Sequence, residues 1–545
     1  MERFERTKQV ISRRAMLRLG VGTAATGALA AILSACGGSS ATTAPATVPA
    51  TTGTKAAGGA TTVATTASGG ATTVSGAATT APTTAAAAAT TAPTTAAGGA
   101  TTAAPVATGA PPPATLPAAT PKVAKNASAT KLTFWHALGG VNGEAVSNLV
   151  NQFNESQSDI FVQDIFQGTY DDELNKFRAG LQAKNGPNIL QVYDIGQRFM
   201  IDSKAIEPMQ TFIDADKFDL SQFEQPILNY YTVDKKLNAM PFNTSNPILY
   251  YNKDAFKAAG LDPNKAPRTW DDVAVAAEKL TKKDASGKAQ PGVAFAIYGW
   301  FFEQWLATQN SLYADPENGR GAARATKVTY NSDAGVKILD WWKGMIDKGT
   351  AANLGRDTTG VQNAFAAGQV SMITESTAAL KGILSKAGGK FEVGTGYMPR
   401  PTAGGEQGGI IMGGAAVYIA KDKPDKEKQA AWKFVQFVAQ AKQQAFFHIN
   451  TGYFPIRKDA YDLPEVKANT EKYPQFQTAI DQLHANPSNP STSGAVLGIF
   501  TQSRTTDCEG AIEETLLGKS TAKAALDKAA GNSNKALDQY NQSVK

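Results

Sequence analysis

Strand-like and helix-like segments alternate between residues 131 and 194, and this alternation limits the fold more than any other feature of the chain. Residues 131–135 (KLTFW) and residues 160–166 (IFVQDIF) have the side-chain pattern of β-strands. Each is followed by apolar residues at helical spacing, namely Val146, Leu149, Val150 and Phe153, then Leu174, Phe177 and Leu181. Asp171 and Asp172 begin the second helical segment, where acidic side chains favour a helix N-terminus.

A third strand is predicted for residues 188–193 (NILQVY), a mostly apolar run that ends at Asp194. The order β-α-β-α-β predicts an α/β fold with a parallel sheet that helices cover on both faces. Ligands of open α/β sheets bind beyond the carboxyl ends of the strands, where this chain has His136, Tyr170 and Asp194. Asp194 is therefore a candidate ligand-binding acid, although a helix cap or a buried ion pair explains its position equally well.

Similar patterns continue toward the C-terminus. A strand predicted at residues 369–374 ends shortly before Ser376, and an apolar strand at residues 409–419 contains the diglycine Gly413-Gly414. A diglycine inside a strand indicates a bend or the close approach of another backbone. The folded part, residues 129–545, is too long for a single core, so we expect it to form two lobes.

The first 35 residues have the organisation of a bacterial signal peptide. The twin arginine Arg13-Arg14 precedes an apolar stretch at residues 19–33, which is short for a membrane span. Residues 33–36 (LSAC) resemble a lipobox, where lipoproteins are diacylated on the cysteine and cleaved before it. Because two acyl chains anchor a protein stably, we expect Cys36 to hold the chain on the outer face of the cell membrane.

Residues 36–128 consist almost entirely of Ala, Thr, Gly, Ser and Pro. Such a segment buries too little apolar surface to offset the ordering of its backbone, and a disordered tether is predicted. The formal charge of +6 is carried by the N-terminal part, because residues 1–35 hold +4, residues 36–128 hold +3 and residues 129–545 hold −1. The folded part therefore has no basic footprint for nucleic acid, and none is expected as a partner.

Seven segments of the folded part together resemble family 1 extracellular solute-binding proteins. They are FWHALGG (134–140), ILQVYDIG (189–196), SKAIEPM (203–209), PFNTSNPILYYNKDAFKAAGLDP (241–263), TWDDVA (269–274), IIMGGAAVYIA (410–420) and TGYFPIRKDAYD (451–462). The resemblance extends over essentially the whole of residues 130–540. Within the family it is strongest to the glycerol-3-phosphate-binding components of ABC importers.

The resemblance implies a two-lobed, periplasmic-binding-protein-like fold whose hinged cleft closes on a ligand, without catalysis, cofactor or metal. It implies a monomer that delivers its ligand to the membrane subunits of an ABC permease. We expect the first lobe to comprise about residues 129–241 and 370–420, and the second about residues 247–368 and 421–545.

Eight ligand contacts carry over from the family to matching positions of this chain. They are Tyr170, Asp194, Ser245, Trp300, Ser376, Gly414, Tyr453 and Arg504. The guanidinium of Arg504 matches phosphate oxygens, and hydroxyl groups and the Gly414 amide can donate to the same oxygens. Since Asp194 would repel a phosphate, we expect it to accept from glycerol hydroxyls across the cleft.

Two positions depart from the pattern of the better-known relatives. Asp194 stands where they have the longer Glu, and one of two aromatic wall residues is replaced near Ile297 or Tyr298, while Trp300 remains. The lost wall would leave room for a glycerophosphodiester such as glycerophosphocholine. Tyr298 or Trp300 could then bind its quaternary ammonium by cation–π attraction.

Three other functions are compatible with parts of the sequence. The first is oligosaccharide binding, as in other members of the family; the second is a secreted phosphodiesterase; the third is an adhesin on a stalk. The three histidines, His136, His448 and His484, lack metal-ligand spacing, which disfavours a metal-dependent enzyme. Cys508 is a lone thiol if Cys36 is lipidated, so no disulfide is expected.

Overall fold

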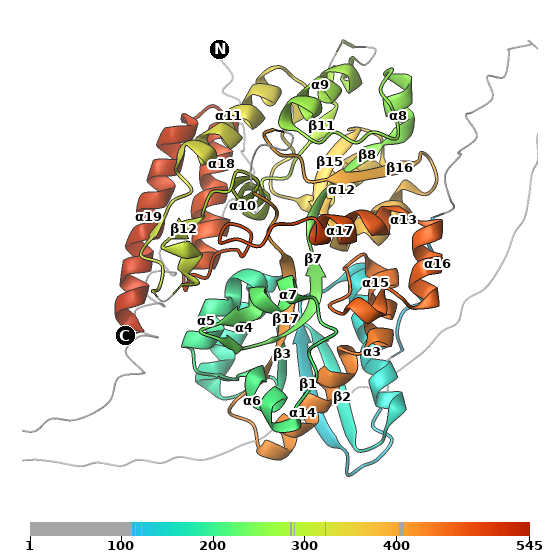
Figure 1. Ribbon diagram of the computed structural model, residues 1–545, viewed down its shortest axis with the longest axis vertical. Coiled ribbons are helices and arrows are strands. Elements are labelled where there is room, and N and C mark those ends of the chain that lie inside the picture. Colours follow the sequence, from blue (N-terminus) through green and yellow to red (C-terminus); the bar gives the residue numbers. More distant parts are fainter. Residues whose placement is uncertain are drawn as a thin grey trace, which may run out of the picture. The chain divides into compact units, whose positions relative to one another are not determined.

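The computed structural model describes residues 112–114, 116–120, 123–283, 286–287, 289–321, 323–402 and 408–544. The predicted signal peptide, Cys36 and most of the predicted tether lie outside these residues. Two large sheets with helices packed around them make up the described part, and we use the sheets to define a first and a second lobe (Figure 1). No helix in the described ranges is both long enough and apolar enough to cross a membrane.

The sheet of the first lobe has six strands in the order β2-β1-β3-β17-β4, with β7 also paired to β17. As the alternating pattern predicted, β1 is parallel to β2 and β3, whereas β17 is antiparallel to β3, β4 and β7. The strands are β1 Thr130–His136, β2 Ile160–Phe166, β3 Ile189–Tyr193, β4 Ile206–Glu207, β7 Met240–Ser245 and β17 Gly413–Ala420.

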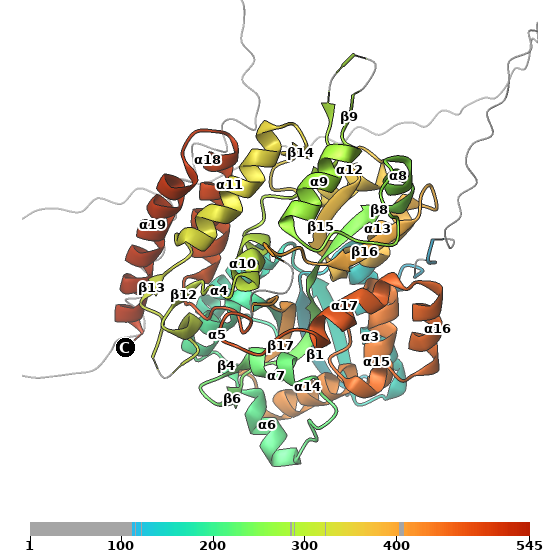
Figure 2. The same cartoon turned by 45° about the horizontal axis from the view of Figure 1, so that its top comes forward.

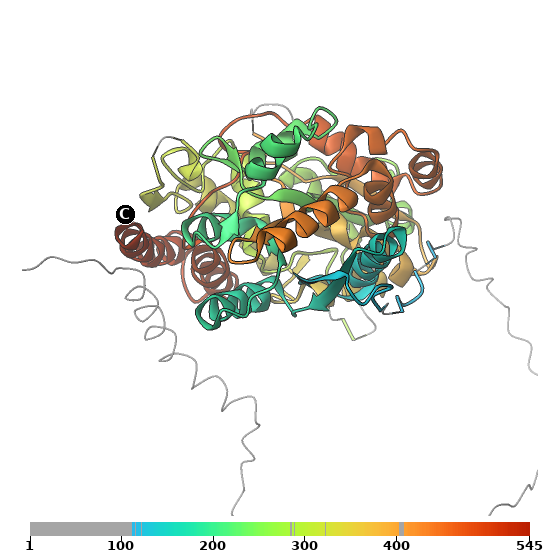
Figure 3. The ribbon, with the colours of Figure 1, turned by 90° about the horizontal axis from the view of Figure 1, so that it is seen from below.

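Helices surround the strands of the first lobe, as the view from below shows (Figure 3). Phe134 of β1 contacts Phe434 of α14, and Phe434 in turn contacts Phe153 of α3, with ring centroids 5.5 and 5.2 Å apart. Thr169 and Asp172 form a capping box at the start of α4, which confirms the predicted helix N-terminus. The helices are α3 Gly140–Ser156, α4 Tyr170–Ala183, α5 Gln197–Asp202, α6 Met209–Asp216, α7 Gln225–Tyr231, α14 Asp425–Val438 and α15 Ala441–Thr451.

The sheet of the second lobe has five strands in the order β14-β11-β15-β8-β16. Its strands are β8 Pro247–Asn252, β11 Val293–Ala294, β14 Ala351–Ala352, β15 Met372–Ser376 and β16 Val393–Tyr397, and its helices are α8 Lys253–Ala258, α9 Trp270–Leu280, α10 Gly299–Thr308, α11 Asp333–Asp347, α12 Thr358–Ala366, α13 Leu380–Ala387 and α17 Gln475–His484. α16 Pro464–Lys472 lies between α15 and α17. Short hairpins pair β5 Thr232–Val233 with β6 Lys236–Leu237, β9 Lys282–Lys283 with β10 Ala289–Gln290, and β12 Ala314–Asp315 with β13 Lys327–Val328.

The C-terminal elements pack on the second lobe. A π-helical segment, η5 (Gln502–Cys508), leads into α18 (Glu509–Leu516), and α19 (Ala522–Ser543) lies beside α11 and α18 (Figure 2). η5 contacts α10, so any residue of η5 is carried by the second lobe.

Strand pairing differs from the expected lobe boundaries in two places. β15 and β16 pair with β8 in the second sheet, because the buried residues Met372 and Ile373 continue that core. In contrast, α14 and α15 return to the first lobe, where α14 packs on β1 and α15 packs on α3. The chain crosses between the lobes directly from β7 to β8, again before β17, and a third time between α15 and α17.

Some described residues before residue 129 lie inside the segment predicted as tether. Pro113 is buried, and Leu116 packs against the hydrophobic core. The Ala119 main-chain N–H donates to Glu144 Oε2 at 2.7 Å, and Asn151 Nδ2 donates to the Thr120 carbonyl at 3.1 Å. Proline-rich chain is already extended when unfolded, so little entropy is lost when this stretch lies on the surface of the lobes.

Candidate functional site

Arg504 is the centre of the candidate site. Its side chain is only 1% exposed, and its guanidinium lies 5.8 Å from the ring centroid of Tyr298 and 5.6 Å from that of Phe500. Gly299 allows this packing, because a Cβ there would lie 2.7 Å from Arg504 Cγ. The aromatic rings and the glycine leave the guanidinium little freedom to move.

Asp194 of the first lobe binds Arg504 of the second. It follows the last residue of β3, and its Oδ2 and Oδ1 accept from Arg504 Nη1 and Nη2 at 2.9 and 3.4 Å. The sequence left open a ligand-binding acid or a buried ion pair, and the structure shows a buried ion pair. It places Asp194 against Arg504 rather than across a gap from it.

Glu303 is a second carboxylate on the same guanidinium. It lies on α10 of the second lobe, is 2% exposed, and its Oε2 accepts from Arg504 Nη1 at 3.3 Å. Burial raises the pKa of Glu303 to about 7, and the Arg504 charge opposes this rise. Burial lowers the pKa of Arg504, but Asp194, Tyr298 and Glu303 together outweigh this effect, and the pKa lies well above its ordinary value.

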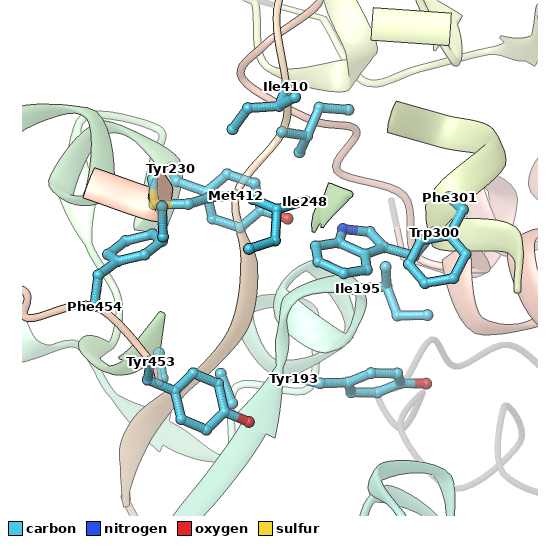
Figure 4. Packing of buried hydrophobic residues seen from close by; sticks show 14 of the residues in the cluster. Tyr193, Ile195, Tyr230, Ile248, Trp300, Phe301, Ile410, Met412, Tyr453 and Phe454 are labelled. Carbon is cyan, nitrogen blue, oxygen red and sulfur yellow. The ribbon is translucent and has the colours of Figure 1, made fainter. Parts of the chain in front are cut away.

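Two buried N–H groups at this site lack a hydrogen-bond partner within the described residues: Arg504 Nε and Trp300 Nε1. Trp300 lies on α10 and packs against the diglycine of β17, since a Cβ on Gly413 would come within 2.4 Å of its ring. Figure 4 shows this ring with Tyr193 and Tyr453, which come from other elements. Unsatisfied buried donors are costly, and they are the groups that an anionic ligand can satisfy.

Three tyrosines of the first lobe form a group that includes Tyr193, the residue directly before Asp194. Tyr170 stacks on Tyr193, with ring centroids 5.2 Å apart and ring planes 9° apart. The Tyr170 hydroxyl accepts from Asn243 Nδ2 at 3.0 Å and is hydrogen-bonded to the hydroxyl of Tyr453. The Tyr193 hydroxyl lies 2.9 Å from Thr501 Oγ1 of the second lobe, which adds a contact between the lobes.

Ser245, Ser376 and Gly414 lie at the crossing between the lobes. Ser245 ends β7 and pairs with Gly413, while Ser376 ends β15 and pairs with Pro247 at the start of β8. The Ser376 hydroxyl accepts from the Ala378 N–H at 3.1 Å. The structure thus brings Tyr170 near Tyr453, Asp194 against Arg504, and Trp300 beside the diglycine; Ser245 and Ser376 lie on the hinge strands.

Several residues of this site were missed by sequence reasoning. Glu303, Asn243, Tyr193 and Thr501 all contact a predicted residue or its direct neighbour. For Glu303 a signal existed, because a carboxylate inside the apolar segment GWFFEQW is rarely buried without a partner. The partner itself is about 200 residues away in the sequence.

The chain belongs to the bacterial extracellular solute-binding proteins, because residues 148–476 match the model of that family. It is therefore a solute-binding protein of the extracytoplasmic space and not an enzyme.

Two similar proteins are both sn-glycerol-3-phosphate-binding periplasmic proteins UgpB. The protein from Pectobacterium atrosepticum is 35% identical over 77% of this chain and 94% of its own length. The protein from Escherichia coli K12 is 36% identical over 76% of this chain and 94% of its own length.

Solved structures share the fold at lower identity. UgpB from Mycobacterium tuberculosis in complex with glycerophosphocholine matches with a TM-score of 0.65 and 22% identity over 76% of this chain and 99% of that one. The cyclic α-maltosyl-1,6-maltose binding protein from Arthrobacter globiformis matches with a TM-score of 0.60 and 24% identity over 75% and 100%. Both matches support the two-lobed architecture.

A second ion-pair cluster joins the lobes away from Arg504. Asp202, at the end of α5, accepts two bonds of 2.7 Å from Arg324 of the second lobe and one of 2.8 Å from the Tyr540 hydroxyl of α19. Arg198 of the first lobe binds the same carboxylate at 2.8 Å. The cluster adds contacts between the lobes without involving any candidate ligand contact.

Replacing Arg324 by Ala is expected to favour the open arrangement, because it removes both Arg324 bonds to Asp202. The loss of a partly exposed ion pair of this kind should weaken the apparent affinity for any ligand of the closed form by about three- to tenfold. Calorimetric dissociation constants and small-angle scattering of the free protein measure the effect. Lys327→Ala is the control, since Lys327 pairs with Asp315 within the second lobe; equal affinities of both variants and wild type would contradict the prediction.

Proposed function

We propose that this protein captures glycerol-3-phosphate or a glycerophosphodiester where its two lobes meet. The observation that carries the proposal is Arg504, a guanidinium buried between the lobes with an N–H group that no described residue accepts. A buried, immobilised guanidinium suits a phosphate better than it suits a neutral sugar. The identity with sn-glycerol-3-phosphate-binding proteins over most of the chain supports the same ligand class.

In this proposal the ligand replaces the contact between Asp194 and Arg504. The phosphate oxygens would accept from Arg504, from Trp300 Nε1 and from the hydroxyls of Tyr170, Tyr453, Ser245 and Ser376, with the Gly414 amide as a further donor. Asp194 would exchange the guanidinium for glycerol hydroxyls. Both buried carboxylates near Arg504 would repel a dianion more strongly than a monoanion, which favours a phosphodiester.

The Tyr298 ring supports a diester with a cationic end. It faces the Arg504 guanidinium at 5.8 Å, which places an aromatic face beside the proposed phosphate position. A structural relative has been solved with glycerophosphocholine, a ligand of this kind.

Calorimetric titration with glycerol-3-phosphate, glycerophosphocholine, choline and maltose tests the proposal. Binding of at least one phosphate ester and none of choline alone is expected, with glycerophosphocholine the tighter of the two esters. Tight maltose binding with indifference to both esters would replace this proposal by oligosaccharide binding.

Delivery to an ABC permease and attachment through a diacylated Cys36 complete the proposed role. The lipobox at residues 33–36 and the family membership support both. Cys36→Ser should abolish the incorporation of labelled fatty acid and release the protein from the membrane fraction. Unchanged labelling of that variant would contradict the anchor without bearing on the ligand.

A further inference from the structure

Arg504 pairs with one carboxylate on each lobe. Separation of the lobes affects the two pairs differently. Asp194 belongs to the first lobe and Glu303 to the second, the lobe that also carries Arg504. Opening of the hinge therefore removes Asp194 from the guanidinium but leaves Glu303 in place. Ligand capture also removes Asp194, since the proposed function assigns that carboxylate to the glycerol hydroxyls.

We propose that Glu303 is the positioning residue that holds the Arg504 guanidinium in its binding orientation while Asp194 exchanges Arg504 for the ligand. This inference rests on the proposed function. It gives the two acids separate tasks: Asp194 contacts the ligand and closes the lobes, whereas Glu303 acts only through Arg504.

The geometry around Glu303 suits this role. Arg504 Nη1 donates both to Glu303 Oε2, at 3.3 Å, and to Asp194 Oδ2, at 2.9 Å, so the two acids share the guanidinium. The Ala495 main-chain N–H hydrogen-bonds the Glu303 carboxylate, which holds the acid itself. Because Arg504 Nε has no partner among the described residues, it stays available to a ligand while Nη1 stays on Glu303.

The charge of Glu303 sets a cost on binding an anion. With both acids ionised and Arg504 charged, the three groups sum to one negative charge, and an arriving phosphate is repelled by Glu303. Burial already raises the pKa of Glu303 to about 7, and a nearby phosphate must raise it further. At about pH 7 ligand binding should therefore be coupled to uptake of a proton by Glu303. A protonated Glu303 still accepts from Arg504 through its carbonyl oxygen.

Other titratable groups also face Glu303 and its neighbours. Those whose charges act on it or are acted on by it are Arg504, Asp194, Tyr230, Arg320, Tyr313 and Cys508. Glu509 also has a pKa raised to about 7 by burial, and it lies in the field of Arg504, but its carboxylate binds the Gly299 N–H and Arg356 instead of the Arg504 guanidinium. Glu509 is accordingly the matched control.

Two substitutions distinguish the hydrogen bond that Glu303 accepts from Arg504 from the negative charge of Glu303. Glu303→Gln keeps an oxygen for Arg504 and removes the charge, so affinity for glycerophosphocholine should stay within about threefold of wild type or increase. Glu303→Ala removes both and should weaken binding by about 100-fold, because the guanidinium then lacks its carboxylate partner among the described residues of its own lobe and keeps only the rings of Tyr298 and Phe500 there. The phosphodiester is chosen because its own charge does not change near neutral pH.

Titration calorimetry in two buffers of different ionisation enthalpy measures the proton uptake. Wild type and Glu509→Gln should take up protons near pH 7 and bind more tightly as the pH falls through about 7, whereas Glu303→Gln should show neither effect. Proton uptake by Glu303→Gln equal to that of wild type would overturn the inference. So would equal affinities of the Ala and Gln variants, provided that circular dichroism shows both folded. If the wild type binds no phosphate ester at all, the proposed function fails first.

Discussion

Replacing Arg504 by Ala should abolish the binding of phosphate esters. The variant loses the guanidinium proposed to hold the phosphate, and charge-assisted bonds of this kind are worth enough to weaken binding by at least about 100-fold. It also leaves Asp194 and Glu303 buried and uncompensated, so the free energy of unfolding should fall by about 3–5 kcal/mol. Calorimetric titration with glycerol-3-phosphate and glycerophosphocholine measures the first effect, and urea unfolding the second.

Two further variants show whether a loss of binding is specific. Arg504→Lys keeps the positive charge but not the two-pronged geometry, and it should fold with affinity intermediate between those of wild type and Arg504→Ala. Arg457→Ala removes an arginine that pairs with Asp459, on an element remote from η5, and should bind normally. Wild-type affinity in Arg504→Ala would show that the ligand is held elsewhere.

Gly414→Ala should strongly destabilise the protein and disturb closure of the lobes. Gly414 has a φ of +101°, and an added Cβ would lie 1.8 Å from the main-chain oxygen of Asn243 on β7. Neither backbone can move freely, because β7 and β17 are paired strands at the crossing between the lobes. Strain and overlap together should lower the free energy of unfolding by about 3–5 kcal/mol, measured by urea unfolding.

Gly260→Ala separates the two causes. Gly260 has a φ of +71°, but an added Cβ there would meet no atom within 4 Å. In this variant the free energy of unfolding should fall by about 1 kcal/mol, which is the cost of the left-handed backbone conformation for a residue with a side chain. If Gly414→Ala and Gly260→Ala lower the free energy of unfolding by the same amount, the close approach of β7 to Gly414 does not add to the effect of the substitution.

The local elements of the first lobe were well predicted from the sequence. The strands at residues 130–136, 160–166 and 189–193, the helix that begins at the Thr169 cap, and the parallel order all follow from side-chain periodicity and capping. These signals act within a few residues, so they survive in the sequence without knowledge of the fold. Membership of an extracellular solute-binding family also followed from the sequence alone.

The lobe boundaries were less well predicted. Residues 372–376 and 393–397 form strands of the second sheet, although the sequence placed them in the first lobe. A buried antiparallel strand has the same apolar pattern in either sheet. Only its pairing with β8 decides to which lobe it belongs.

By itself, the sequence determined that the chain has an α/β fold and that its third strand ends on an acid, and its resemblance to a family supplied a set of predicted ligand contacts. The tertiary structure alone decided that Asp194 is bound to Arg504 and that Glu303 shares the same guanidinium. The reason is physical: Asp194 and Glu303 lie about 310 and 200 positions from Arg504, and all three are brought together only by the packing of α10, η5 and the end of β3. No local pattern in the sequence encodes ion pairs between residues that are so far apart along the chain.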